Sequence, residues 1–305
     1  MGASFGRGGA TTFQQDLANA DVILIEGSNM AECHPVGFQW VMEAKARGAK
    51  VIHVDPRFTR TSAVADLHVP IRAGTDIAFL GALVNHVLSN ELEFREYVVA
   101  YTNAAAVIGE DFRDTDDLDG LFSGFDPETG SYDPASWHYD GAGADPAAGT
   151  VRGQEGHRSS DDAAGHEAAR SEAAGSGGPS VRFKPERDET LQHPRCVYQI
   201  LKRHFARYTP DLVERVCGIS PDKFREVADA LTSASGRDRT GAFVYSVGWT
   251  QHSTGVQNIR TASILQLLLG NIGRPGGGIM ALRGHAGIQG STDIPTLFNL
   301  LPGYL

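Results

Sequence analysis

Short apolar runs that pass directly into polar turns constrain the fold of this chain most strongly. Three of them follow one another near the start, at 20–29, 49–57 and 66–71, and a fourth lies at 241–252. Short, partly β-branched apolar runs bounded by turn signals are typical of strands buried in a parallel sheet. Each run is therefore predicted to be a buried strand whose carboxyl end leads into a turn.

Helical patterns separate these strands. Residues 35–47 form one pattern, and residues 77–88 form another that Thr75 or Asp76 is placed to cap. Further helices are expected at 196–208, 210–217, 221–232 and 258–273. The resulting β-α-β-β-α order predicts an α/β fold, a doubly wound, mostly parallel sheet with helices on both faces.

Residues 140–180 depart from this pattern. Small, polar and charged residues dominate there, with almost no large apolar side chains. Such a segment cannot bury enough apolar surface to offset the entropy lost on ordering. We expect a disordered surface insertion, with its histidines and acidic residues solvated rather than bound to metal.

Composition excludes several classes of function. The 305-residue chain has a formal net charge of −10, which argues against a nucleic-acid footprint or a polybasic membrane surface. No apolar run is long enough to span a bilayer, and the first residues lack the pattern of a signal peptide. Cys33, Cys196 and Cys217 are widely spaced, without a CxxC. This chain alone is thus expected to ligate no metal and no iron–sulfur cluster.

Polar residues gather in the turns that follow the predicted strands. These turns are 27–35, 55–57, 72–76 and 246–252. In open α/β sheets the carboxyl edge of the strands is where ligands bind. Taken singly, Asp55 could simply cap its turn and have no role in binding. Together, the four turns favour a large nucleotide-like ligand. No GxGxxG is present, so an ordinary NAD site is disfavoured.

Two glycine-rich segments raise further possibilities. The stretch FGRGGA at 5–10 has the density of a phosphate loop but lacks a preceding strand, so a frayed terminus is the alternative. In 282–293, Arg283 and His285 lie between glycines. An arginine there suits bidentate recognition of a carboxylate, although a surface loop arginine is the alternative.

The motifs HPVGFQW, DPRFTRT, GWTQHS and ALRGH…IQG are specific as a set. Through them the chain resembles the catalytic (alpha) subunit of respiratory, nitrate-inducible-type formate dehydrogenases, which belong to the dimethyl-sulfoxide-reductase superfamily. The resemblance covers nearly the whole chain outside 140–180. It implies two-electron oxidation of formate to carbon dioxide at molybdenum or tungsten held by bis(molybdopterin guanine dinucleotide).

The resemblance also assigns roles to residues. It places the following residues against the cofactor: Gly27, Asn29, Glu32, Asp55, Arg57, Gly74, Asp76, Gly248, Thr250, Gln251 and Gln289. Asp55 and Arg57 would bind a guanosine end. Arg283 would orient formate at the metal, and His285 would act beside it.

Other parts of the family's subunit have no counterpart in this sequence. They are the iron–sulfur domain that carries a 4Fe-4S cluster, the selenocysteine or cysteine that ligates the metal, and the far cofactor domain. The chain is therefore expected to be a fragment whose start was assigned after an in-frame UGA. FGRGGA would then lie just downstream of the metal ligand. The expected domains are 1–285, interrupted by the insertion, and 286–305 as the start of a neighbouring domain.

The resemblance implies partners as well. Formate, an iron–sulfur beta subunit and a membrane cytochrome subunit are expected, in an exported membrane-associated complex whose signal lies outside this chain. Neither nucleic acid binding nor direct membrane insertion is expected. Two alternatives stay open: a nitrate or thiosulfate reductase of the same superfamily, and a non-catalytic nucleotide-binding α/β domain.

Overall fold

A computed structural model describes residues 1–5, 8–133, 136–141, 185–285 and 287–291. The chain divides into two compact units, one made of Met1–Thr102 with Leu201–Leu305 and the other of Asn103–Ile200. The insertion expected at 140–180 lies almost wholly outside the described residues, as does most of 286–305. The domain boundaries expected from the sequence stay predictions.

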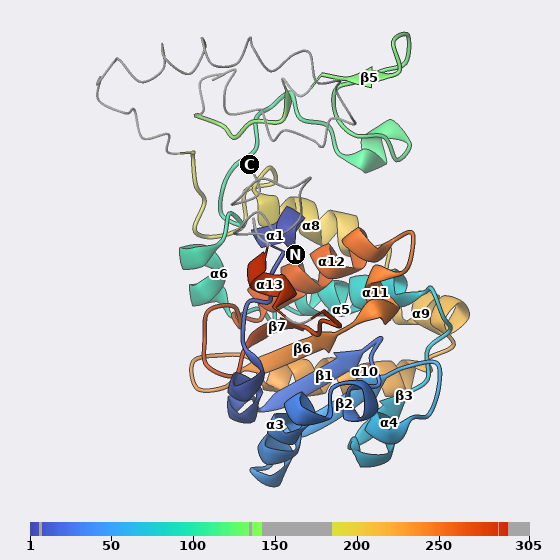
Figure 1. Ribbon diagram of the computed structural model, residues 1–305. Coiled ribbons are helices and arrows are strands. Elements are labelled where there is room, and N and C mark those ends of the chain that lie inside the picture. The colour runs from blue at the N-terminus through green and yellow to red at the C-terminus, as the bar shows by residue number, and fades with distance from the viewer. Residues whose placement is uncertain (6–7, 134–135, 142–184, 286, 292–305) are drawn as a thin grey trace, which may run out of the picture. The chain divides into compact units, whose positions relative to one another are not determined.

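A five-stranded parallel sheet forms the centre of the first unit (Figure 1). Its strands are β1 (Val22–Glu26), β2 (Lys50–Val54), β3 (Leu67–Val69), β6 (Gly241–Tyr245) and β7 (Gly278–Ala281). Their order is β3-β2-β1-β6-β7, so the chain runs outward on one side of β1 and returns to the other side. This confirms the predicted α/β class. The predicted strands all form, whereas β7 was not expected, because it is short and begins at the third of three consecutive glycines.

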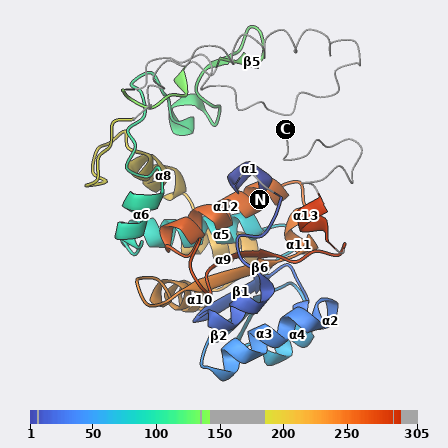
Figure 2. The same cartoon turned by 60° about the vertical axis from the view of Figure 1, so that its left-hand side comes forward.

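Helices cover both faces of this sheet. Alternate residues of a strand point to opposite faces, and Ile23 and Ile25 of β1 pack with residues of α3 (Pro35–Ala46). In both views α3 lies on one side of the sheet, while α5 (Asp76–Ser89) and α12 (Gly255–Leu268) lie on the other (Figures 1 and 2). The two faces are therefore both buried, as the continuous apolar strands indicate.

Further elements complete the two units. In the first unit they are α1 (Gly2–Phe5), η1 (Gln14–Asn19), α2 (Met30–Cys33), α4 (Arg60–Val64), α6 (Arg95–Tyr101), α9 (Pro210–Cys217), α10 (Pro221–Ser233), α11 (Val247–Thr250) and α13 (Ile288–Ser291). The second unit contains η2 (Thr115–Leu118) and the antiparallel pair β4 (Phe125–Asp126) and β5 (Ser131–Tyr132), and α8 (Val197–Phe205) begins there. Across the described ranges, no helix is long and apolar enough to cross a membrane.

A buried amide pair fixes the start of β6 and β7. The Gln266 side chain of α12 donates to the carbonyl of Gly241 at 3.1 Å and to that of Gly278 at 3.0 Å. Asn271 donates to Gln266 at 2.6 Å and accepts from the Gly241 amide at 3.1 Å. Because every group in this network has a partner, it specifies one register instead of leaving a buried amide unpaired.

Candidate functional site

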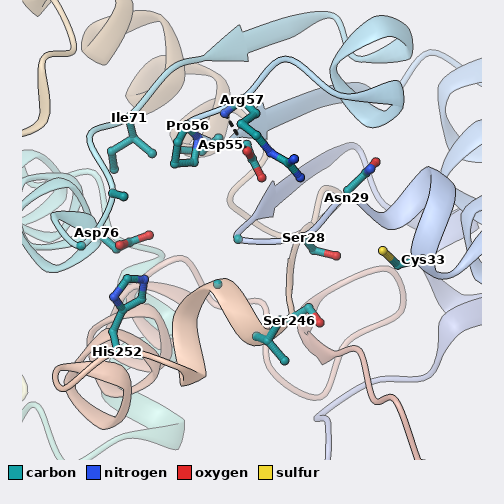
Figure 3. A pocket seen from close by; sticks show the side chains of 16 residues that line it. Ser28, Asn29, Cys33, Asp55, Pro56, Arg57, Ile71, Asp76, Ser246 and His252 are labelled. Carbon is teal, nitrogen blue, oxygen red and sulfur yellow. Dashed lines mark hydrogen bonds between the residues drawn. The ribbon is translucent and has the colours of Figure 1, made fainter.

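A pocket of about 410 Å³ lies at the carboxyl edge of the sheet (Figure 3). It is lined by turns that follow β1, β2, β3 and β6. The lining residues are Gly27, Ser28, Asn29, Cys33, Val54, Asp55, Pro56, Arg57, Ile71, Ala73, Gly74, Asp76, Ser246, Val247, Gly248 and His252. Because the chain leaves β1 towards β2 on one side and β6 lies on the other, this is the switch point where doubly wound sheets bind ligands.

Two glycines bring the turns after β1 and β6 into backbone contact. The amide of Gly248 donates to the Gly27 carbonyl at 3.0 Å, and Gly27 has a φ of +65°. A Cβ on Gly248 would lie 2.4 Å from the Gly27 Cα. Only glycine allows so close an approach, and both residues are therefore required for the shape of the pocket floor.

A buried histidine holds the first turn from below. His53 of β2 is fully buried, with Nε2 at 3.0 Å from the Ser28 carbonyl and Nδ1 at 2.8 Å from the Ser62 hydroxyl. Burial lowers the pKa of His53, so the ring is neutral at pH 7. Nε2 then donates to Ser28, and Nδ1 accepts from Ser62. Ser62 in turn accepts from the Thr59 amide, which starts α4.

Charged side chains enter the pocket from different turns. Figure 3 shows Asp76 and His252 at one end of it, Asn29 and Cys33 at the other, and Asp55 between them. Asp55 Oδ1 accepts from the Arg57 amide at 2.8 Å, so this carboxylate does shape its own turn. Its other oxygen is available to a ligand, because among the described residues it makes only a long 3.8 Å contact to His53.

One hydroxyl in the pocket wall has no partner. Ser28 is 5% exposed, and its Oγ makes no hydrogen bond within the part of the chain that the structure describes. A buried polar atom without a partner is costly unless a ligand or water satisfies it. Carboxylates from Asp55 and Asp76, a guanidinium from Arg57 and this hydroxyl together suit a ligand that carries both N–H donors and anionic oxygens.

The pocket does not include every residue that the resemblance assigned to the cofactor. Thr250 and Gln251 are exposed at the end of α11, and neither lines the pocket. Glu32 is also exposed, but its Oε2 accepts from the Asn29 side chain at 2.5 Å. Asn29 additionally accepts from Thr61 at 3.0 Å, so its orientation is fixed from two sides.

A separate cluster joins Arg283 to the N-terminal stretch. Arg283 Nη2 donates to the Gly8 carbonyl at 2.6 Å, and the Ala10 amide donates to Gln289 at 2.5 Å. The carbonyl of Arg283 accepts from His34 Nε2 at 3.1 Å. Arg283 Nε is buried, with no hydrogen-bond partner among the described residues. The contact between FGRGGA and this arginine was not predicted from the sequence.

His285 lies beyond this cluster. His285 is exposed, and its backbone carbonyl accepts a hydrogen bond from the Ile288 amide at 3.5 Å. Across the described residues, no group of His, Cys, Asp and Glu side chains has the arrangement of a metal site. The residues of the pocket and of the Arg283 cluster offer a ligand hydrogen-bond acceptors, guanidinium groups and backbone amides.

Sequence reasoning passed over part of the pocket lining. The residues not nominated are Ser28, Cys33, Val54, Pro56, Ile71, Ala73, Ser246, Val247 and His252. Each lies within or beside one of the turns that the strand pattern located. Their position at the strand ends is the feature of the sequence that indicates them. Their residue types do not, because most are apolar or small.

Comparison with known proteins places the chain in a family. The family model described as molybdopterin oxidoreductase matches residues 4–297. The chain belongs to this family. Family membership implies a molybdopterin cofactor, and the unpaired Ser28 hydroxyl with the acceptor and guanidinium groups around it fits the polar groups of such a cofactor.

Several formate dehydrogenase subunits are similar over the whole chain. The major subunit of formate dehydrogenase-O from Escherichia coli is 46% identical over 100% of this chain and 26% of its own length. The alpha subunit of formate dehydrogenase 2 from Nitratidesulfovibrio vulgaris is 45% identical, with the same coverage. The chain thus spans about a quarter of the length of these relatives. Among solved structures, acetylene hydratase from Pelobacter acetylenicus aligns with 88% of this chain and 25% of its own, at 15% identity and a TM-score of 0.49.

Proposed function

We propose that this chain is the part of a formate dehydrogenase catalytic subunit that holds one molybdopterin guanine dinucleotide, with the guanosine end in the pocket. The observation that carries the proposal is the convergence of four strand-end turns on one pocket at the switch point of the sheet. Its volume of about 410 Å³ lies within the usual range for small-molecule sites. Identities of about 45% to formate dehydrogenase subunits support the choice of substrate.

The pocket residues would bind the guanosine end through complementary polar groups. A guanine base presents adjacent N–H donors, and the carboxylates of Asp55 and Asp76 are able to accept hydrogen bonds from them. Arg57 lies beside Asp55 and would donate to oxygens of the nucleotide. The unpaired Ser28 hydroxyl would donate to the ribose or to a phosphate. Gly27 and Gly248 supply the close backbone approach beneath it.

Arg283 would hold formate. Its Nη2 is anchored on the Gly8 carbonyl, which leaves the other guanidinium nitrogens able to bind a carboxylate, including the unpartnered Nε. A two-pronged contact fixes the direction of the formate C–H bond as well as its position. When bound, the metal-containing cofactor supplies the two-electron redox chemistry. His285 is proposed to lie near the same substrate.

The finer properties of the assembled enzyme are proposals by the same relationship. They include molybdenum or tungsten held by two guanine dinucleotides, a selenocysteine or cysteine metal ligand, and a 4Fe-4S cluster in another domain of the subunit. An iron–sulfur beta subunit and a membrane cytochrome subunit would accept the electrons in an exported, respiratory complex. Homology to formate dehydrogenase major subunits supports these points. Thr250, Gln251, Glu32 and Gln289 are proposed to contact the cofactor outside the pocket.

GDP binding tests the assignment of the pocket. Asp76→Asn replaces an acceptor by an amide, and we expect the GDP dissociation constant of the chain, measured by calorimetry, to rise on the order of tenfold to a hundredfold. Asp222→Asn is the matched control, because Asp222 also lies in the first turn of a helix, α10, but is exposed. Equal affinity in the two variants would contradict a contact between Asp76 and the base.

A further inference from the structure

Glu26 is a buried acid that the proposed binding scheme does not use. It is the last residue of β1, it is 0% exposed, and it lies directly before the Gly27 turn. Its carboxyl lies beside the carboxyl of Asp76 and the indole of Trp249, yet neither of its oxygens completes a well-formed hydrogen bond within the described chain. An acid this deep in a sheet needs a proton or a partner, since a bare buried charge is very costly.

Two carboxyls side by side cannot both stay ionised in a buried place. Asp76 is itself only 6% exposed, and burial together with the Asp76 charge raises the pKa of Glu26 well above its ordinary value of 4.5. The geometry decides which of the two carries the charge. Asp76 stands in the first turn of α5, where the helix dipole favours an anion, and it borders the open pocket. Glu26 has neither advantage.

The other groups around the pair leave this assignment intact. From α9, the Cys217 thiol donates to the Thr75 carbonyl at 3.5 Å, and burial raises its pKa, so it is neutral. Arg72 is the nearby cation, but its Nη1 donates to the carbonyls of Arg215 and Val216 at the end of α9. No described lysine, arginine or histidine forms an ion pair with Glu26 or Asp76.

We propose that Glu26 is a positioning residue that stays protonated and donates its O–H to Asp76, so that Asp76 is held as the carboxylate that the pocket presents to the N–H groups of a guanine base. This inference rests on the proposed function, which places that base in the pocket. Glu26 does not line the pocket and acts only through Asp76. Trp249, whose indole N–H has no well-formed partner in the described part of the chain, would donate to the carbonyl oxygen of the same carboxyl.

The proton on Glu26 is directly observable. At neutral pH the infrared spectrum of the chain should show the C=O stretch of a protonated carboxylic acid. Glu26→Gln should remove this band, and Glu43→Gln, which changes an exposed glutamate of α3, should leave it in place. A spectrum in which Glu26→Gln changes no protonated-acid band would overturn the proposal whether or not the chain binds GDP.

GDP affinity then tests the positioning role. Once the pH passes the Glu26 pKa, the wild-type affinity should fall by about tenfold per pH unit relative to Glu26→Gln, whose amide donates without ionising. The ratio of the two affinities cancels the ionisation of GDP itself. Glu26→Leu keeps position 26 uncharged but donates no hydrogen bond, so this variant should bind GDP more weakly than Glu26→Gln at every pH. It also supplies a second reference that does not ionise.

The outcomes separate the inference from the proposed function. An infrared spectrum in which Glu26→Gln changes no protonated-acid band would refute the role of Glu26 and leave the pocket assignment standing. Equal affinities of Glu26→Leu and Glu26→Gln would also refute it. If the wild type binds no GDP at any pH, the pocket assignment fails, and the infrared band still decides whether Glu26 is protonated.

Stability supplies a readout that needs no ligand. The folded chain holds the Glu26 proton more tightly than the unfolded chain does, so the free energy of unfolding should fall as the pH rises from about 4.5 towards the raised pKa. Glu26→Gln should lack this part of the decline, so its melting temperature should increasingly exceed that of the wild type as the pH rises. Glu43→Gln should follow the wild type. A constant difference between Glu26→Gln and the wild type would contradict a raised pKa.

Discussion

Gly248→Ala is expected to destabilise the chain by about 2 to 3 kcal/mol and to abolish GDP binding. The added methyl group would lie 2.4 Å from the Gly27 Cα, 2.6 Å from its oxygen and 2.8 Å from its carbonyl carbon. All three are backbone atoms, so no side chain is able to rotate away. The turns after β1 and β6 would have to separate, which breaks the hydrogen bond from Gly248 to Gly27 and opens the pocket floor.

A second glycine provides the control for this substitution. A Cβ added to Gly284 would have no atom within 4 Å, and the φ of Gly284 does not lie in the left-handed region. Gly284→Ala should therefore change the free energy of unfolding by no more than about 0.5 kcal/mol in urea titrations. If Gly248→Ala changes the free energy of unfolding equally little, the turns after β1 and β6 are not in the close contact described, and the proposed shape of the pocket floor is wrong.

Arg283→Lys is expected to raise the KM for formate by about tenfold to a hundredfold in the assembled enzyme, with a smaller effect on kcat. Lysine is still able to donate to the Gly8 carbonyl that Arg283 Nη2 contacts, so the tie to the N-terminal stretch is preserved. What is lost is the planar fork and the unpartnered Nε. The change therefore separates substrate binding from folding.

Steady-state kinetics with a dye acceptor measures this effect. Arg225→Lys is the matched control, because Arg225 lies on the exposed face of α10 and, among the residues that the structure describes, pairs only with Asp222. Its KM should equal that of the wild type. An unchanged formate KM in Arg283→Lys would remove the proposed substrate contact.

The sequence predicted the strands of the sheet well because they share one physical signature. Each is a short, mostly apolar run that passes into a turn, which is the pattern expected of a strand buried on both faces. β7 (Gly278–Ala281) was not predicted because it begins at the last of three consecutive glycines, and glycine usually disfavours a strand. Its place is fixed instead by the Gln266 side chain, a contact between residues that are distant in sequence.

The pocket was predicted only in part. Asp55, Arg57 and Asp76 lie at strand ends and reach it together, because parallel strands bring their carboxyl ends to one edge. Periodicity does not show that Glu26 is buried beside Asp76, because that pairing depends on where α5 packs against β1. The contact of Arg283 with Gly8 was not predictable for the same reason, since 275 positions separate the two residues.

The most direct test of the account is the content of the purified enzyme that carries this chain. Mild acid release followed by chromatography measures guanine nucleotide, and elemental analysis of the same sample measures molybdenum and tungsten. We expect guanine nucleotide in at least stoichiometric amounts, together with one of the two metals and formate-dependent reduction of a dye. Protein that is folded and active on formate but contains no guanine nucleotide would contradict it.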